Sequence, residues 1–290
     1  MPEQHTGEPG ITTAGQRAAR ERTRALRARE IARRHELLAA QANPELRALH
    51  LDMAEMHRAI ERRHMAAARM HAYHAARLST WSGRSAMPRF MSAVATALGV
   101  EHVGVSLVFG NREQAVNVGS DEVAVAAQEA EFTLGEGPVH DVTKAGAAVT
   151  VDEAALTSRW PRFASAVTGL GVRAVAAAPL RTSTNCLGVL TVFDPPAEPE
   201  RAAAALATVA DALVYSSLLV PESGDPLDLP LLDGGEDHAV VHQASGMVAE
   251  QLGCRADDAL IVLRARAFTT DEPLAAIAAE VVHSGLRLDR

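Results

Sequence analysis

Residues 238–288, HAVVHQASGMVAEQLGCRADDALIVLRARAFTTDEPLAAIAAEVVHSGLRL, decide the fold of the C-terminal part of the chain. Apolar side chains recur there every three or four positions in three successive segments, the pattern of one buried helix face. Gly253 and Gly285 follow the first and third segments, and glycine commonly ends helices. Because the connections are short, the three helices are predicted to pack as neighbours in a bundle. The predicted bundle core contains Ala244, Gly246, Ala259, Leu263, Ala267, Ile277 and Ala278.

Gly246 is a costly residue inside the first of these helices. Glycine destabilises a helix interior by about 1 kcal/mol relative to alanine. We expect another helix to approach closely at this position, where a side chain would be in the way.

The ordered set of residues in this stretch resembles the ANTAR domain, an RNA-binding three-helix module of bacterial transcription antiterminators. The matching residues are Gln243-Ala244-Ser245-Gly246-Met247-Val248, Ala259, Leu263-Arg264, Ala267, Leu274, Ile277-Ala278 and Val281-Val282. The resemblance implies binding to paired hairpin loops in nascent mRNA, which blocks a terminator. The residues expected to contact RNA are Gln243, Ser245, Arg264, Arg266 and His242.

The charge of this module departs from what RNA binding favours. Eight acidic residues stand against five arginines from Asp237 to Arg290, and RNA affinity depends on neutralising phosphates. The family also commonly has lysine where this chain has Ser245. An alternative therefore stays open, in which the chain is a dimeric signalling module that acts through protein contacts and has weak or lost RNA binding.

Length and composition indicate a multidomain protein. The chain has 290 residues, enough for two domains, and its two cysteines exclude a disulfide framework and a cysteine-based metal site. The N-terminus lacks a signal-peptide pattern, and Asp211 interrupts the most apolar run, residues 202–220. We expect a cytoplasmic protein without a membrane span.

The N-terminal part, residues 1–84, is predicted to be a basic helical arm after a disordered start over residues 1–15. Fourteen arginines and seven acidic residues lie between Arg17 and Arg77, although the whole chain has a formal charge of −8. Helices are predicted over residues 16–42 and 44–79, with Asn43 as the cap and Pro44 at the first helical position. A short coiled-coil-like seam follows Leu46, Leu49, Met53, Met56 and Ile60.

The arm pattern is typical of a helical hairpin or a dimer contact, and an arginine surface that meets RNA phosphates is the alternative. His50, His57, His64 and His71 recur every seven residues on the second helix, about 10 Å apart, too far for successive members to share a metal ion. We expect these histidines to be solvated and no metal to be bound.

Residues 85–220 change to a period of two, which predicts strands. Val103, Val105, Leu107 and Phe109 alternate, and further strands are expected over residues 114–118, 149–152, 172–180 and 187–193. Helices are expected over residues 87–98, 120–130, 160–168 and 200–219. Together these elements predict an α+β domain with an antiparallel sheet and flanking helices.

This middle part resembles GAF domains. The residues that carry the resemblance are Leu134-Gly-Glu-Gly-Pro138, Val172-Arg-Ala-Val-Ala-Ala-Ala-Pro-Leu180 and Leu187-Gly-Val-Leu-Thr-Val-Phe-Asp194. The resemblance implies a sensory domain that holds an unknown small ligand or only dimerises, and GAF followed by ANTAR is typical of actinobacterial regulators. Glu136 and His140 are the candidate ligand-pocket residues.

No cofactor and no catalytic residue are expected. The stretch has one thiol, Cys186, which cannot form a disulfide with itself, and no phosphate loop or nucleophile elbow is present. Residues 221–236 are rich in proline, glycine and acidic residues and predict a linker before the domain at 237–290. The sequence thus favours a ligand-responsive, homodimeric RNA-binding antiterminator.

Overall fold

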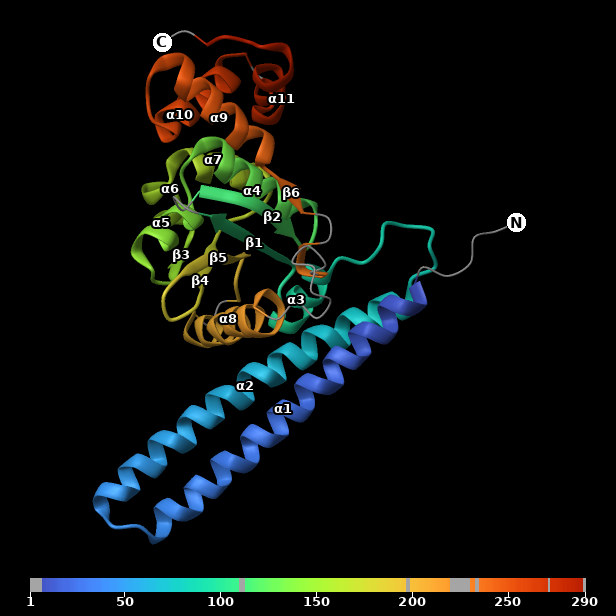
Figure 1. Ribbon diagram of the computed structural model, residues 1–290, viewed down its shortest axis with the longest axis vertical. Helices are drawn as coiled ribbons and strands as arrows, with labels where there is room; N and C mark the ends of the chain where they lie inside the picture. Colours follow the sequence, from blue (N-terminus) through green and yellow to red (C-terminus); the bar gives the residue numbers. More distant parts are fainter. Residues whose placement is uncertain are drawn as a thin grey trace.

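A computed structural model describes residues 7–109, 113–196, 199–219, 230–232, 235–270 and 272–288. A long helical hairpin leads into a domain built on one sheet, and a small helical bundle follows (Figure 1). The hairpin and the bundle lie at opposite ends of the sheet domain. The predicted α+β class, with an antiparallel sheet, an N-terminal helical arm and a C-terminal three-helix bundle, is confirmed.

The arm consists of α1 (Gly7–Gln41) and α2 (Pro44–Thr80), which pack against each other along their length. The helix begins at Gly7, so residues 7–15 are helical where disorder was predicted. Asn43 Oδ1 accepts the N–H of Leu46 at 3.0 Å and so caps α2. Alanines at the interface let the two helices approach closely. The buried alanines of α1 are Ala14, Ala25, Ala28, Ala32 and Ala39.

The histidine stripe of α2 faces α1, and the prediction that it is solvated is wrong. The His50 Nδ1 lies 3.1 Å from that of His35, and the His64 Nδ1 lies 2.6 Å from Glu21 Oε2. His71 is buried beside Phe90. Heptad spacing put these rings on one side of α2, and that side became the hairpin interface.

Six antiparallel strands form one sheet in the order β3-β4-β5-β1-β2-β6. The strands are β1 (His102–Phe109), β2 (Glu113–Gly119), β3 (Val149–Val151), β4 (Val175–Arg181), β5 (Cys186–Phe193) and β6 (Glu236–Asp237). Both faces are covered, so alternate side chains are buried on opposite sides. In β5, for example, Leu190 and Val192 join one cluster, while Val189 and Phe193 join clusters on the other face.

One face of the sheet packs on the end of α2, on α3 (Phe90–Leu98) and on α8 (Pro199–Leu213). The other face is covered by α4 (Glu122–Leu134), α5 (Pro138–Ala145), α6 (Glu153–Arg159) and α7 (Pro161–Gly169). The predicted last helix of this domain, 200–219, ends as a π-helical segment, Val214–Leu218. Helices α5 and α6 stand where no helix was predicted.

The C-terminal bundle comprises α9 (Ala239–Leu252), α10 (Ala256–Thr270) and α11 (Leu274–Ala279), and a π-helical turn, Glu280–Ser284, continues α11. Most of the predicted linker, residues 221–229 and 233–234, lies outside the described residues. Its end is fastened to the sheet domain, because β6 pairs with the edge of β2, Val116 opposite Asp237. Leu231, in a short 3-10 turn, is buried in the core of the sheet domain.

Within the described ranges, no helix is both long and apolar enough to cross a membrane. The apolar run around Asp211 forms α8, and its buried residues Leu206, Val209 and Leu213 pack against the sheet.

Candidate functional site

The bundle is joined to the sheet domain through Phe132, near the end of α4. Its side chain is 2 % exposed and belongs to the hydrophobic core of the bundle, with Val241 and Leu263 among its neighbours in that cluster. The His238 ring stacks on it, with 3.6 Å between ring centroids and 13° between planes. The two units therefore share one core residue, which ties the position of the bundle to α4.

Two histidines add polar contacts around this core. The Nε2 of His238 lies 3.2 Å from Glu129 Oε1 and 3.1 Å from the side-chain amide of Asn117. The Nε2 of His242 lies 2.7 Å from the carbonyl oxygen of Gln114 in β2, to which its N–H donates. His242, predicted to contact RNA, is thus engaged by the sheet domain in this arrangement.

Arg264 is held at the same joint. Its guanidinium carbon lies 5.6 Å from the Phe132 ring centroid. Gly135, which ends α4 with a φ of +67°, leaves the space that Arg264 fills, since a Cβ there would lie 2.7 Å from Nη1. A second residue predicted to contact RNA therefore packs against the sheet domain.

The other residues predicted to contact RNA differ in exposure. Gln243 and Arg266 are exposed on the bundle surface. Ser245 is 3 % exposed, and its hydroxyl donates to the carbonyl of His242 at 2.8 Å. The expectation that Ser245 faces RNA is therefore not met in this arrangement, because its one donor is used within α9.

Gly246 lies on the surface, so its predicted place in the bundle core is wrong. Among the described residues, a Cβ added there would meet no atom within 4 Å. The other six predicted core residues are buried. The helix-destabilising glycine is thus not explained by packing inside the protein.

Glu136 and His140, the predicted ligand-pocket residues, have separate roles. Glu136 Oε1 accepts the N–H groups of Arg162 and Phe163 at 2.6 and 3.1 Å, which caps the first turn of α7. Burial alone would raise the pKa of Glu136, but these bonds and the Arg162 guanidinium hold the pKa below its ordinary value. Glu136 does not line the cavity described next, whereas His140 does.

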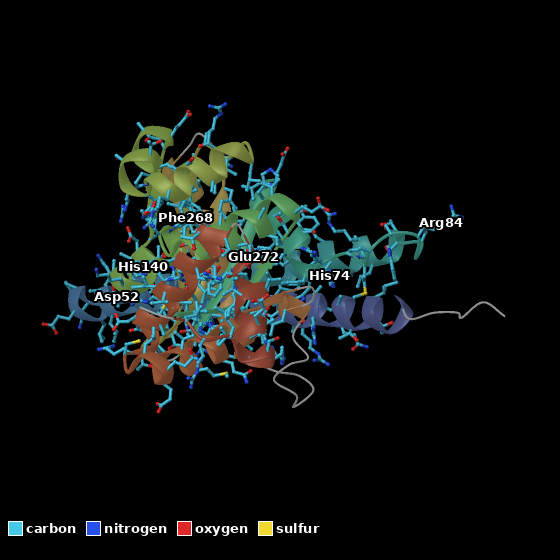
Figure 2. The ribbon with its side chains drawn as sticks, turned by 90° about the horizontal axis from the view of Figure 1, so that it is seen from above. Asp52, His74, Arg84, His140, Phe268 and Glu272 are labelled. Carbon is cyan, nitrogen blue, oxygen red and sulfur yellow. The ribbon has the colours of Figure 1, made fainter. Side chains whose placement is uncertain are left out.

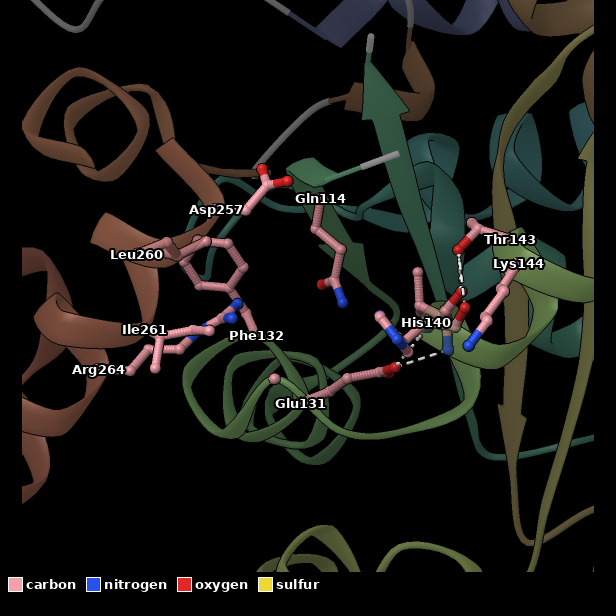
Figure 3. A pocket seen from close by; sticks show the side chains of 12 residues that line it. Gln114, Glu131, Phe132, His140, Thr143, Lys144, Asp257, Leu260, Ile261 and Arg264 are labelled. Carbon is pink, nitrogen blue, oxygen red and sulfur yellow. Dashed lines mark hydrogen bonds between the residues drawn. The ribbon is translucent and has the colours of Figure 1, made fainter. Parts of the chain in front are cut away.

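A cavity of about 390 Å³ lies between α4, α5 and β2 of the sheet domain and α10 of the bundle (Figure 3). Its volume suits a small molecule. Glu131 stands in its wall with its side chain buried, and Oε1 accepts the N–H groups of Val139 and His140 at 2.6 and 3.3 Å. Burial raises the pKa of Glu131 to about 8 against the effect of these two bonds, and the charge of Asp141 adds to the rise.

Two family models match the chain, the GAF domain over residues 84–216 and the ANTAR domain over residues 235–282. The chain contains a GAF domain followed by an ANTAR domain. None of the curated proteins compared with the chain matches it. The ANTAR match begins before β6, so the ANTAR segment supplies the sixth strand of the GAF sheet.

The space between the GAF sheet and α4 is filled by protein side chains. Only glycine fits at position 104 of β1, because a Cβ there would lie 2.5 Å from the Gln128 side chain. Gln128 Nε2 donates to the carbonyl of Val105 at 2.9 Å and lies 3.1 Å from Ser106 Oγ. The cavity of about 390 Å³ lies instead at the joint with the ANTAR domain.

Three residues of the joint were missed in the sequence: Phe132, His238 and Glu131. Phe132 ends an amphipathic helix and looks like an ordinary core residue, and His238 is a single histidine before a helix. Nothing local in the sequence shows that they meet. The one usable signal was Leu134-Gly135, since a left-handed glycine at a helix end is where another segment can approach.

We expect Glu131→Gln to change how stability depends on pH. The pKa of Glu131 is 4.5 in the unfolded protein and about 8 in the folded protein. Below pH 4.5 the carboxyl group is therefore protonated in both states. Between pH 4.5 and about 8 it is protonated only in the folded protein. Wild-type stability therefore falls as pH rises through this window. Glutamine keeps an acceptor for Val139 and cannot ionise, so the variant should exceed wild type by at least about 1 kcal/mol at pH 8. Urea denaturation between pH 5 and 8 measures this difference.

Glu136→Gln is the matched control. The pKa of Glu136 is lowered, so its contribution is complete above pH 4.5 and is lost only as pH falls through the folded pKa. Its difference from wild type should stay constant from pH 5 to 8. A constant difference for Glu131→Gln as well would show that Glu131 is ionised in the folded protein at neutral pH.

Proposed function

We propose that the protein is a ligand-responsive RNA-binding regulator of transcription antitermination. The ANTAR bundle binds tandem hairpin loops in nascent mRNA, and the GAF domain controls when it does so. The observation that carries the proposal is the docking of His242 and Arg264, both expected RNA contacts, on the GAF domain. A sensor that holds residues of an RNA-binding module can regulate it by releasing them.

The exposed part of the bundle offers the remaining contacts. Gln243, Gly246 and Arg266 are exposed, and Gly246 leaves open backbone on the surface of α9. Because no part of the described protein occupies the space over Gly246, close approach of an RNA backbone or base accounts for glycine there. Such close approach is a recognised use of glycine in ligand contacts.

Binding to another protein is the second candidate, and exposed apolar residues on α10 favour it. Ile261 and Phe268, seven residues apart on α10, are 61 % and 83 % exposed. Large exposed apolar side chains on an acidic module suit a protein contact. Enzymatic activity is the weakest candidate, since GAF and ANTAR domains are sensing and RNA-binding domains.

We infer that the protein is a homodimer joined through the arm. The predicted seam is incompletely covered in one chain, since Leu46, Leu49 and Met56 are 45–54 % exposed. Residues 24–41 of α1 carry five arginines and two glutamates, whereas residues 44–61 of α2 carry two arginines and four acidic residues. Pairing α1 of one copy with α2 of a second copy would bring opposite charges together while it buries the seam.

Arg266→Ala should weaken binding of a tandem-hairpin RNA from the protein's own operon leader. Loss of one phosphate contact is expected to lower affinity about 5–10-fold and to reduce the slope of log K against log salt by about one. Filter binding over a range of salt concentrations measures both. Arg255→Ala is the control, because Arg255 is another exposed arginine of the bundle and pairs with Asp257. An equal loss of RNA affinity in the two variants would show that Arg266 contributes only its charge and makes no specific contact.

Gly246→Ala should separate stability from RNA binding. The space around Gly246 is open, so alanine should stabilise α9 by up to about 1 kcal/mol. RNA affinity should nevertheless fall, because the methyl group blocks close approach. Gly15→Ala, at another helical glycine with no atom within 4 Å, should raise stability and leave RNA affinity unchanged. Unchanged affinity in Gly246→Ala would remove this glycine from the interface.

Leu46→Glu combined with Leu49→Glu should convert the dimer to a monomer. Both side chains are about half exposed in one chain, so the charges should leave the fold of the monomer intact, but they would be buried in the proposed four-helix contact. Sedimentation equilibrium measures the mass, and circular dichroism checks the fold. Leu170→Glu, at an exposed leucine of the GAF domain, should remain dimeric. A wild-type monomer at high concentration would contradict the inference.

A further inference from the structure

The cavity at the GAF–ANTAR joint is built by both domains. Its walls come from β2, α4 and α5 on the GAF side and from α10 on the ANTAR side (Figure 3). Neither domain encloses it alone, so it exists only while the bundle is docked. Any molecule bound there touches the sensor and the RNA-binding module together.

The cavity presents hydrogen-bonding groups that the protein itself does not satisfy. Gln114 Oε1 is buried and has no hydrogen-bond partner among the described residues. Its amide points into the space between Phe132 and His140 (Figure 3). A buried acceptor without a partner is costly, and only a ligand N–H or O–H could satisfy it. The N–H groups of the same amide are donors, and an anion can accept from them.

Charged groups around the cavity favour an anion. The cationic side chains that face it are Lys144, on α5 of the GAF side, and Arg264, on α10. Asp257 of α10 and Glu131 are the acidic groups, and the raised pKa of Glu131 keeps its carboxyl neutral at pH 7. Its Oε1 is occupied by two N–H groups, so the protonated Oε2 is left as a donor. The apolar walls are formed by Val139, Leu260 and Ile261.

We propose that this cavity binds a small organic monoanion, with one carboxylate held near Lys144 and Gln114 and a short apolar body against α10. A carboxylate can accept from the Lys144 ammonium and from the Gln114 amide N–H. The apolar body replaces water beside Leu260 and Ile261. A bound anion that touches both domains stabilises the docked arrangement.

The consequence for RNA rests on the proposed function. In the docked arrangement His242 and Arg264 contact the GAF domain, so an anion that favours docking opposes RNA binding. Linkage requires the reverse as well, so RNA must lower the affinity for the anion by the same factor.

Lys144 is the only lysine in the chain, which allows a direct test of the site. The full-length protein is acetylated with an amine-reactive ester, and mass spectrometry follows Lys144, with the N-terminal amine as internal reference. The probes are 3-phenylpropanoate and 4-methylpentanoate, and 3-phenylpropylamine is the matched cation. Saturable protection of Lys144 by the anions, with a Kd of about 1 mM or tighter, and none by the amine is expected. No protection by either anion at about 20 mM, or equal protection by the amine, overturns the proposal.

Two variants keep the site testable independently of the lysine chemistry. Gln114→Leu removes an unsatisfied buried group and keeps the backbone carbonyl that His242 uses, so it should fold and lose anion affinity at least five-fold. Lys144→Gln should lose anion affinity by a similar factor, as measured by calorimetry. Arg84→Gln makes the same charge change far from the cavity and should bind normally (Figure 2). Unchanged affinity in both cavity variants overturns the assignment.

The RNA arm of the experiment separates this inference from the proposed function. Saturating 3-phenylpropanoate should weaken RNA binding, and RNA should restore acetylation of Lys144. Protection of Lys144 with unaltered RNA affinity supports the site and overturns the coupling. Protection of Lys144 by a protein that binds no RNA supports the anion site and contradicts the proposed antitermination function.

Discussion

Burial of Phe132 in the core of the ANTAR bundle is the contact on which the arrangement of the two domains depends. The side chain grows from a GAF helix yet shares a hydrophobic cluster with all three bundle helices. Its stacking with His238 and its contact with Arg264 follow from that position. Separating the domains would expose Phe132 and the bundle core together, so docking has an apolar driving force that polar contacts alone would not supply.

The fold could be predicted where a hydrophobic pattern extended over many residues. It could not be predicted where the element was too short to show a pattern. The alternation of Val103, Val105, Leu107 and Phe109 and the 3-4 spacing of α9 extend over enough residues to identify a strand and a helix. Helices α5 and α6 have eight and seven residues, which is too short for a periodic signal. They were marked only by Pro138 and by the Asp152 cap, whose side chain accepts the N–H of Ala155. The pairing of β6 with β2 could not be predicted from the sequence, because a strand of two residues shows no alternating pattern.

The candidate site shows a different limit. The order of residues along the chain was enough to recognise the ANTAR domain. It did not predict which of those residues are exposed. Ser245 and Gly246 are neighbours on one helix, and a rotation of 100° between them puts one inside and the other outside. Glu136 looked like a ligand-pocket acid because a loop carboxylate next to a helix start has the same sequence signature as a cap. Whether Arg264 faces solvent or Gly135 depends on a domain contact that no local pattern encodes.

The acidity of the bundle is compatible with regulated RNA binding once docking is considered. Each phosphate contact adds a fixed increment to log affinity, so a module with few cations loses a larger share of its binding when one is withheld. Arg264 is one of four arginines in the described part of the bundle, residues 239–288. For the proposed RNA binding, holding it against Phe132 would withhold part of the phosphate neutralisation. A strongly basic bundle would bind RNA even while partly covered, whereas a weakly basic surface makes the domain contact decisive.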